Sequence, residues 1–526
     1  SSEYIKELNE SGKLYLFEIY NKDFADMSTG NKNLHTLYFE ALFSDQNKDK
    51  DYVFKLDGEA ELFFRPKSLE KILENRKSSH EIISKRRYTE DKIFFHVPIT
   101  INRVQKSATK FNAKINNVLA SNRNINIVGV DRGEKHLAYY SVINQKGERL
   151  ESGSFNIING VDYQSKLTEK AKSRDQARKD WQTIENIKEM KKGYISQIVR
   201  KIADLAIKHN AVIVLEDLNV RFKQVRGGIE KSIYQQLEKA LIEKLNYLVN
   251  KNETDPNKAG HVLKGYQLTA PFENFKSMGK QTGIIFYTQA SYTSKIDPVT
   301  GWRPHLHLKY VNAEQAKAEI CKFSKIEFVN NRFAFTYDIK VFEPNKKEYP
   351  KKTIWTICSN VERFRWNKNL ENNKGGYERY ADITEPLKQL FKLVNIDIKQ
   401  NILEQIRTLN TKGNEKFFKD LVFYIELICQ IRNTDENASD PNHKDFILSP
   451  VEPFFDSRDP QNVEKGLPQN ADENGAYNIA RKGIIILKKL SDLKNNKKNF
   501  EEMSWSDIYV SDVEWDNFAV EGGTSI

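Results

Sequence analysis

The chain has 526 residues, of which 39% are hydrophobic and 29% are charged, and its formal net charge at pH 7 is +11. This length exceeds one ordinary hydrophobic core and predicts several structural units, while the hydrophobic share excludes a largely disordered chain. The basic excess favours a polyanionic partner such as nucleic acid; a lysine-rich surface without a specific partner is the alternative on charge alone.

The cysteines and the hydropathy pattern limit the class of protein further. Cys321, Cys358 and Cys429 lie far apart and form no CxxC pair, so neither a disulfide framework nor a four-thiolate zinc ribbon is available. No apolar run approaches the ~20 residues that span a bilayer, and the N-terminal SSEYIKELNESGK lacks the apolar core of a signal peptide. We therefore expect a cytoplasmic protein with no membrane partner, and a chain that continues a longer polypeptide.

The N-terminal region alternates aromatic-rich segments with polar turns. KLYLFEIY, LHTLYFEALF and AELFFR are separated by STGNKN and LDGE, which predicts strands and turns of a β-rich module. The stretch that follows is basic, with Lys85, Arg86 and Arg87 in succession. It is predicted to be either a solvated helix or connector, or an arm that contacts phosphates.

Strands are predicted next at IFFHVPITIN and NINIVGVD, and then at HLAYYSVIN and RLESGSFNI on either side of the turn QKGE. Asp131 therefore falls at the end of the first of three neighbouring strands. Residues 163–209 contain no proline and have helical periodicity. Their change from a highly charged to an amphipathic sequence predicts an exposed basic helix that leads into a helix packed on a sheet.

The segment AVIVLEDL is continuously apolar, which is typical of a strand buried on both faces of a mixed or parallel sheet, and Glu216 ends it. The following SIYQQLEKALIEKLNYLV predicts a helix, so this region is α/β. Its apolar stripe consists of Tyr234, Leu237, Leu241, Leu245 and Leu248.

Between about residues 265 and 468 the pattern loosens and predicts an inserted α+β domain, with helices at TEPLKQLFKLV and KFFKDLVFYIELICQIRN. Asp472 then stands just before a predicted helix. The apolar face of that helix consists of Ala476, Ile479, Ala480 and Ile484.

Three acidic residues carry the most definite chemistry of the sequence. Each of Asp131, Glu216 and Asp472, taken singly, is more often a cap or turn residue. Together, a strand and hairpin with Asp131, a buried strand with Glu216 and a late helix with Asp472 describe a ribonuclease-H-like fold whose acids converge. Because converging carboxylates repel one another, we expect a divalent cation there. Mg²⁺ prefers oxygen ligands, and two such ions can clamp the attacking and leaving oxygens of a phosphodiester.

The segments IVGVDRGEKHLAYY, VIVLEDLNVRFK and ADENGAYNIARKG resemble, in order, the three RuvC motifs of type V-A CRISPR effectors, the Cpf-type RNA-guided DNA endonucleases. GEAELFFRPKS, RYTEDKIFFHVPITIN, SKIDPVTGW and FDSRDPQN extend the resemblance over essentially the whole chain. The resemblance implies that Asp131, Glu216 and Asp472 hold Mg²⁺, with Mn²⁺ as the alternative ion. It implies a single RuvC site that cuts both strands of a target.

The resemblance also implies a fold class and a domain division. The fold class is an α/β ribonuclease-H-like RuvC domain, with an inserted α+β Nuc domain and a β-rich, oligonucleotide-binding-like wedge segment. The wedge would cover residues 1–106 and hold the handle of the guide RNA. RuvC would occupy 107–162, 181–288 and 471–526, the bridge helix 163–180 and the Nuc domain 289–470.

Further residues receive roles from the same resemblance. Arg363, in WTICSNVERFRW, falls where the family has an arginine needed for cleavage, and an ordinary surface arginine is the alternative. Trp181 would anchor the bridge helix against the recognition lobe, with a half-buried core tryptophan as the alternative. The expected nucleic-acid contacts are Lys85, Arg86 and Arg87, with His35 and Lys67, for the guide RNA, and Arg178 and Lys179 on the bridge helix.

The implied partners are a CRISPR guide RNA, double-stranded target DNA and single-stranded DNA, in a prokaryotic cytoplasm and in antiviral defence. We also expect an N-terminal recognition lobe as a partner, because the sequence begins inside the wedge. Ser84 stands where a guide-processing lysine is expected, and His80 matches a different histidine of the family. Guide processing is therefore not expected of this chain.

Two alternatives stay open. One is a nucleic-acid-binding fragment that is inactive without its recognition lobe. The other is a transposon-encoded RuvC nuclease, although members of that group usually carry a four-cysteine ribbon, which three scattered cysteines do not supply.

Overall fold

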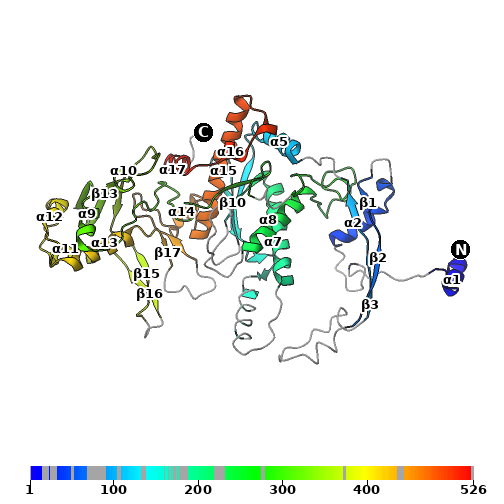
Figure 1. Cartoon of the computed structure of the whole chain (residues 1–526), viewed down its shortest axis with the longest axis horizontal. Coiled ribbons are helices and arrows are strands. Elements are labelled where there is room, and N and C mark those ends of the chain that lie inside the picture. The colour runs from blue at the N-terminus through cyan, green and yellow to red at the C-terminus, as the bar shows by residue number, and fades with distance from the viewer. Residues whose placement is uncertain are drawn as a thin grey trace. The chain divides into compact units, whose positions relative to one another are not determined.

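The computed structural model divides into two units, which are treated separately. One comprises residues 1–107, 172–186 and 242–271, and the other comprises 108–171, 187–241 and 272–526. Figure 1 shows the elements along the chain. The structure describes residues 2–14, 23, 32–48, 52–67, 91–102, 108–131, 138–158, 160–163, 165–166, 169, 173, 176, 188–217, 231–273, 279–370, 375–434 and 444–522.

The first unit combines short helices with two antiparallel strand pairs. Strand β1 (Phe54–Leu56) pairs with β4 (Ile99–Ile101), and β2 (Glu61–Arg65) pairs with β3 (Lys92–His96). The strands predicted at AELFFR and IFFHVPITIN are thereby confirmed. The helical elements are α1 (Ser2–Glu10), α2 (Leu34–Leu42) and the 3₁₀ turn η2 (Asp45–Asn47).

The prediction of a strand at LHTLYFEALF is wrong, because this segment forms helix α2. The Asn33 side chain caps it by accepting a hydrogen bond from the backbone N–H of Thr36 at 3.1 Å. Ala41 and Leu42 are buried with Phe54 in a small core. The cap and the core together outweigh the strand preference of the aromatic residues.

The second unit is built on a mixed five-stranded sheet in the order β11-β10-β5-β6-β7. Strand β10 lies between β5 and β11 and is parallel to both, whereas β6 and β7 are antiparallel to their neighbours. This confirms the buried strand at AVIVLEDL and the hairpin after Asp131, whose turn contains Gly147 with φ +81°. The strands are β5 (Asn126–Asp131), β6 (Tyr139–Ile143), β7 (Arg149–Ser154), β10 (Ala211–Asp217) and β11 (Ile285–Gln289).

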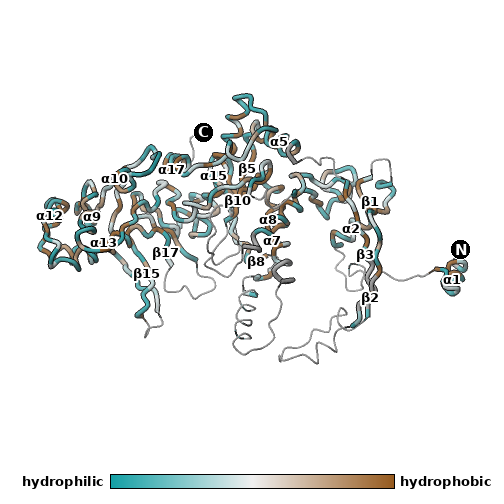
Figure 2. The backbone as a smooth tube through the Cα atoms, in the orientation of Figure 1, coloured by the Kyte–Doolittle hydropathy of each residue, from teal (hydrophilic) through white to brown (hydrophobic). Residues whose placement is uncertain are grey.

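Helices cover this sheet and bury its strands. Helix α15 (Ala471–Asn495) lies along β5 and β6, and its Ile479 and Ile484 share a core with Ile127 and Val214. Helix α7 (Lys188–Lys208) contacts β10 and β5. Figure 2 shows hydrophobic segments along β5 and β10. Nearby elements are α5 (Ala108–Leu119), α8 (Lys231–Asn246), β8 (Ile157–Ile158) and β9 (Val161–Asp162).

The segment between β11 and α15 folds around its own core of helices and antiparallel strands. The helices predicted at TEPLKQLFKLV and KFFKDLVFYIELICQIRN are confirmed as α11 (Thr384–Leu393) and α13 (Glu415–Ile428). The strands are β12 (Lys325–Val329), β13 (Arg332–Asp338), β14 (Ile354–Cys358), β15 (Arg363–Asn367), β16 (Gly376–Tyr380), β17 (Arg432–Asn433) and β18 (Phe446–Ile447). The other helices are α9 (Ala313–Ile320), α10 (Ile339–Phe342), α12 (Ile402–Thr408) and α14 (Pro460–Glu464).

The last elements of the chain belong to the second unit. They are η4 (Phe500–Glu502), α16 (Trp505–Ile508) and α17 (Asp512–Val520). Asp516 on α17 forms a buried ion pair with Arg303, with two hydrogen bonds of 2.8 Å. Within the described residues, no helix is both long enough and apolar enough to cross a membrane.

Candidate active site

Two of the predicted acids end neighbouring parallel strands. Asp131 is the last residue of β5, and Glu216 is the next-to-last residue of β10. The register pairs Leu215 with Val130, so Glu216 lies beside Asp131 across a strand spacing of about 4.8 Å. Asp131 is 6% exposed and Glu216 is partly buried. The parallel pairing therefore brings together carboxylates that are far apart in the sequence.

The third acid comes from the first turn of helix α15. Asn470 caps this helix with its side chain, which accepts a hydrogen bond from the backbone N–H of Glu473 at 2.9 Å. Asp472 therefore lies inside the helix as its second residue, and not before it as the sequence predicted. The positive end of the helix dipole favours a carboxylate here. Asp472 is 7% exposed, so it is held within the fold.

Glycines allow α15 to approach β5 closely. A Cβ added to Gly475 would lie 1.9 Å from Oδ2 of Asp131, and one added to Gly129 would lie 2.3 Å from the carbonyl oxygen of Ala476. Farther along α15, a Cβ on Gly483 would lie 2.8 Å from methyl groups of Ile127 and Val214. The absence of side chains at these positions lets the helix carry Asp472 up to the strand that carries Asp131.

Both Glu216 and Asp472 act electrostatically on Asp131. Burial raises the pKa of Asp131 well above its ordinary value, and the negative charges of Glu216 and Asp472 raise it further. The guanidinium of Arg432 acts in the opposite direction, and a side-chain hydrogen bond with Glu216 adds to the increase. The three acids therefore hold more negative charge than their surroundings compensate, and they favour a bound cation.

Arg432 is a site residue that the sequence did not reveal. Its Nη2 lies 3.3 Å from Oδ1 of Asp472 and 2.7 Å from Oδ2 of Asp445. Asp445 also accepts a hydrogen bond from the Thr434 hydroxyl at 2.8 Å, and its backbone oxygen accepts one from the N–H of Ala471. In the sequence, Arg432 follows a long apolar run directly, but KFFKDLVFYIELICQIRN predicted one continuous helix that includes this arginine. The insert thus places a positively charged side chain, that of Arg432, beside the carboxylate of Asp472.

In a comparison with protein families, the model of the RuvC nuclease domain matches residues 105–523. The chain belongs to the RuvC nuclease domain family. This family has the ribonuclease-H-like α/β fold, which is the fold class predicted for the core of the chain. Membership in the family indicates nuclease activity. The matched residues include all three acids.

The carboxylates of the RuvC site fit a hard divalent cation by their chemistry, because they supply only oxygen donors. Among the described residues, no three acidic, histidine or cysteine side chains already form a metal-binding cluster. Asp131 is hydrogen-bonded to Glu216, and Asp472 is paired with Arg432. The guanidinium of Arg432 thus neutralises part of the negative charge of the carboxylates.

A buried lysine of α15 feels the charge of Glu216. Lys482 is 2% exposed, and its Nζ donates hydrogen bonds of 2.8 Å to the backbone oxygens of Gln289 and Ser291. Burial lowers the pKa of its ammonium to about 8, and the charge of Glu216 opposes this decrease. The lysine ties α15 to the end of β11. In the sequence this lysine stands out only as part of the segment ADENGAYNIARKG.

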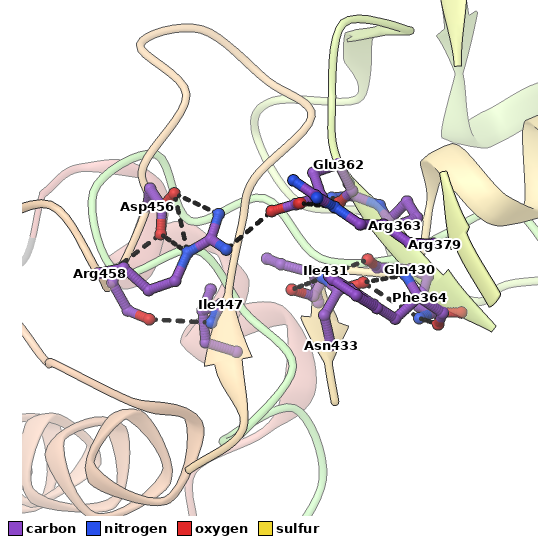
Figure 3. A network of polar contacts seen from close by, with 11 residues as sticks. Glu362, Arg363, Phe364, Arg379, Gln430, Ile431, Asn433, Ile447, Asp456 and Arg458 are labelled. Carbon is purple, nitrogen blue, oxygen red and sulfur yellow. Dashed lines mark hydrogen bonds and ion pairs between the residues drawn. The ribbon is translucent and has the colours of Figure 1, made fainter. Parts of the chain in front are cut away.

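Among the described residues, the hydrogen bonds of Arg363 go to backbone oxygens of the insert and not to the three carboxylates. Figure 3 shows Arg363 in a network of polar contacts beside Glu362. Its side chain is fully buried, and it donates hydrogen bonds to the backbone oxygens of Leu427 and Ile428 at the end of α13 and of Glu362. Burial lowers its pKa to about 9. Its burial rules out the alternative of an ordinary surface arginine, and the role in cleavage stays a prediction. Its observed role is to stabilise the C-terminus of a helix.

The remaining predicted contacts receive less support from the structure. His35 is exposed, and the backbone N–H of Lys67 donates a hydrogen bond to Asp91. Residues that lie outside the described part of the chain are His80, Ser84, Lys85, Arg86, Arg87, Arg178, Lys179 and Trp181.

Proposed function

We propose that the chain is the nuclease portion of an RNA-guided DNA endonuclease of the type V-A CRISPR class. In this proposal a single RuvC site hydrolyses phosphodiester bonds of both target strands with Mg²⁺, or with Mn²⁺ as the alternative ion. The convergence of Asp131, Glu216 and Asp472 carries the catalytic part of the proposal. The order of the motifs along the chain supports the RNA-guided part.

Each group of the site has a distinct task in this proposal. A bound divalent cation would activate water and stabilise the leaving oxygen of the phosphodiester. Asp131 and Glu216 present their carboxylates from adjacent strands, so the sheet fixes their separation. Asp445 holds Arg432, and Arg432 in turn orients Asp472. Since a guanidinium pairs well with phosphate, Arg432 also offers hydrogen-bond donors to a scissile group beside Asp472.

The proposal assigns the other parts of the chain as follows. Residues 1–106 would bind the handle of the guide RNA, and the insert would be the Nuc domain. The basic residues Lys85, Arg86, Arg87, Arg178 and Lys179 would contact nucleic acid, and Trp181 would contact the recognition lobe. Base pairing with the guide would select the target, while the protein supplies the cut. The setting would be the cytoplasm of a prokaryote.

The test measures cleavage of labelled single-stranded and double-stranded DNA by the chain with guide RNA, in Mg²⁺ and in EDTA. Asp131→Asn, Glu216→Gln and Asp472→Asn are each expected to lower the rate by more than about 100-fold, because even the outer partners of metal ligands contribute 10–100-fold. DNA binding should remain close to that of the wild type.

Asp217→Asn is the matched control. Asp217 follows Glu216 on β10, so its side chain points to the other face of the sheet, and it acts electrostatically on Glu238 and Tyr287. This variant should cleave normally. Cleavage in EDTA, or cleavage at the wild-type rate by Asp131→Asn, would contradict the proposal. Binding without cleavage by the wild type would favour the inactive nucleic-acid-binding fragment.

A further inference from the structure

A basic cavity lies at the end of α15 that is opposite Asp472. It has a volume of about 320 Å³, is open to solvent and is bordered by α5, the last turn of α15 and η4. All of these elements belong to the second unit. The principal side chains in its lining are Lys114, Asn117, Lys494, Lys497, Lys498 and Phe500.

The local fold explains how four lysines reach one cavity. Lys114 and Asn117 lie one turn apart on α5, so they share a face of that helix. Helix α15 ends at Asn495, and Lys497 adopts a left-handed conformation with φ +55°, which turns the chain back. A lysine in the last turn of a helix is favoured by the helix dipole. That effect accounts for Lys494 but not for the other three.

The positive charge around this cavity is largely uncompensated. Lys494 donates hydrogen bonds to neutral groups, the backbone oxygen of Asn117 and the hydroxyl of Ser121. Lys498 pairs with Asp507 at 2.8 Å. Lys114 and Lys497 make no ion pair with any residue that the structure describes.

Glu501 is the one acidic residue among the described side chains that line the cavity. Three of the four ammonium groups therefore lack an anionic partner of their own. Like charges around one cavity repel each other, and an anion there would relieve this repulsion.

We propose that this cavity binds phosphate groups of a nucleic-acid backbone. Ammonium groups donate hydrogen bonds and accept none, which suits phosphate oxygens. Phe500 is half-buried beside the lysines and offers an apolar surface to a sugar or a base. A polynucleotide fits the cavity better than an isolated phosphate does, because the lysines are exposed around an open site.

The position of the cavity relates it to the carboxylates. From Asp472 to Lys494 the helix advances 22 residues, or about 33 Å at 1.5 Å per residue. This length corresponds to about ten steps of 3.4 Å along a nucleic-acid strand. One polynucleotide could therefore contact the carboxylates and the cavity together. This inference rests on the proposed function for the nature of its ligand.

The experiment compares Lys114→Gln/Lys497→Gln with the wild type in EDTA, where hydrolysis does not contribute. Fluorescence anisotropy measures the affinity for a 20-nucleotide single strand and for a duplex of the same length over a range of salt concentrations. Loss of two phosphate contacts should weaken binding and reduce the slope of log K against log salt by about 1.4 to 1.8.

The control is Lys399→Gln/Lys412→Gln, which removes the same charge from exposed lysines of the insert. It should leave both affinity and slope unchanged. Equal effects of the two double variants, or no effect of either, would overturn the proposal. Inorganic phosphate is tested as a competitor. If it binds the wild type but not Lys114→Gln/Lys497→Gln while DNA binding by this variant is unchanged, the cavity is a small-anion site and the proposal fails.

Cleavage by the same variant separates this proposal from the proposed function. With Mg²⁺, its cleavage of a substrate too short to reach the cavity should equal that of the wild type, and its cleavage of the longer strand at limiting concentration should fall. Unequal cleavage of the short substrate would count against the cavity as a separate site.

Discussion

Gly475→Ala is expected to displace the Asp131 carboxylate and to prevent cleavage while the fold persists. An alanine Cβ would lie 1.9 Å from Oδ2 of Asp131, whereas ordinary contact begins at 3.4 Å. The carboxylate or the helix must therefore move by 1.5 Å, the difference between these distances. Since Asp131 and Gly475 belong to the elements that hold two of the acids, either movement separates the carboxylates.

The expected magnitudes differ for stability and for catalysis. Overpacking of this kind costs about 1–3 kcal/mol. Alanine returns about 1 kcal/mol through its better helix propensity. The net loss of about 0–2 kcal/mol is small against a typical stability of about 5–15 kcal/mol. In contrast, a 1 Å misplacement in a catalytic site can cost about 100-fold in rate, so we expect a loss of at least that size.

Gly483→Ala is the control for this prediction. It lies two turns farther along α15, and its Cβ would contact methyl groups of Ile127 and Val214 at 2.8 Å. It should lower the melting temperature without changing cleavage. The assays are single-turnover cleavage over a range of Mg²⁺ concentrations, thermal unfolding and direct Mn²⁺ binding. Wild-type cleavage and metal binding by Gly475→Ala, or an equal catalytic loss in Gly483→Ala, would refute the reasoning.

Two further predictions concern the buried, positively charged side chains of Lys482 and Arg363. Burial lowers the pKa of Lys482 from 10.5 to about 8, so between these pH values the unfolded chain keeps a proton that the folded chain releases. The free energy of unfolding of the wild type should thus rise across this window by up to about 3 kcal/mol relative to that of Lys482→Met. Urea unfolding measures this free energy at each pH. An equal change with pH in the two proteins would contradict the prediction. Arg363→Ala should destabilise the insert by about 3 kcal/mol, because several buried hydrogen bonds to a charged group are lost, while cleavage per folded molecule is retained. Loss of cleavage with unchanged melting would restore a catalytic role for Arg363.

The sequence predicted well the features that local patterns encode. The unbroken apolar run before Glu216 predicted a strand buried on both faces, and β10 is an interior strand with a neighbour on each side. Asp131 was predicted at a strand end before a hairpin, where the structure places it. The pattern also indicated that α15 buries Ile479 and Ile484. In each case a short stretch of sequence, through the length or the period of its apolar residues, determines the local structure.

The features that depend on distant contacts were not accessible in this way. Helix α2 forms where aromatic residues predicted a strand, because an asparagine cap and a small core decide the outcome. Arg363 of the insert was expected to serve the site. In the structure it donates a hydrogen bond to a backbone oxygen at the end of α13, while Arg432, 69 residues later, pairs with Asp472. A side chain's partner across the fold is set by tertiary packing, which neither hydropathy nor motif spacing records.

The distribution of the acids along the chain also sets when the site can form during synthesis. Asp472 follows Asp131 by 341 residues, which takes a ribosome roughly 20–70 s at 5–20 residues per second. Until α15 emerges, the sheet face with Ile127 and Val214 lacks its covering helix, and the third carboxylate does not yet exist. The growing chain therefore lacks a complete set of carboxylates for most of its synthesis. A nuclease arranged in this order stays inactive until most of it has been translated.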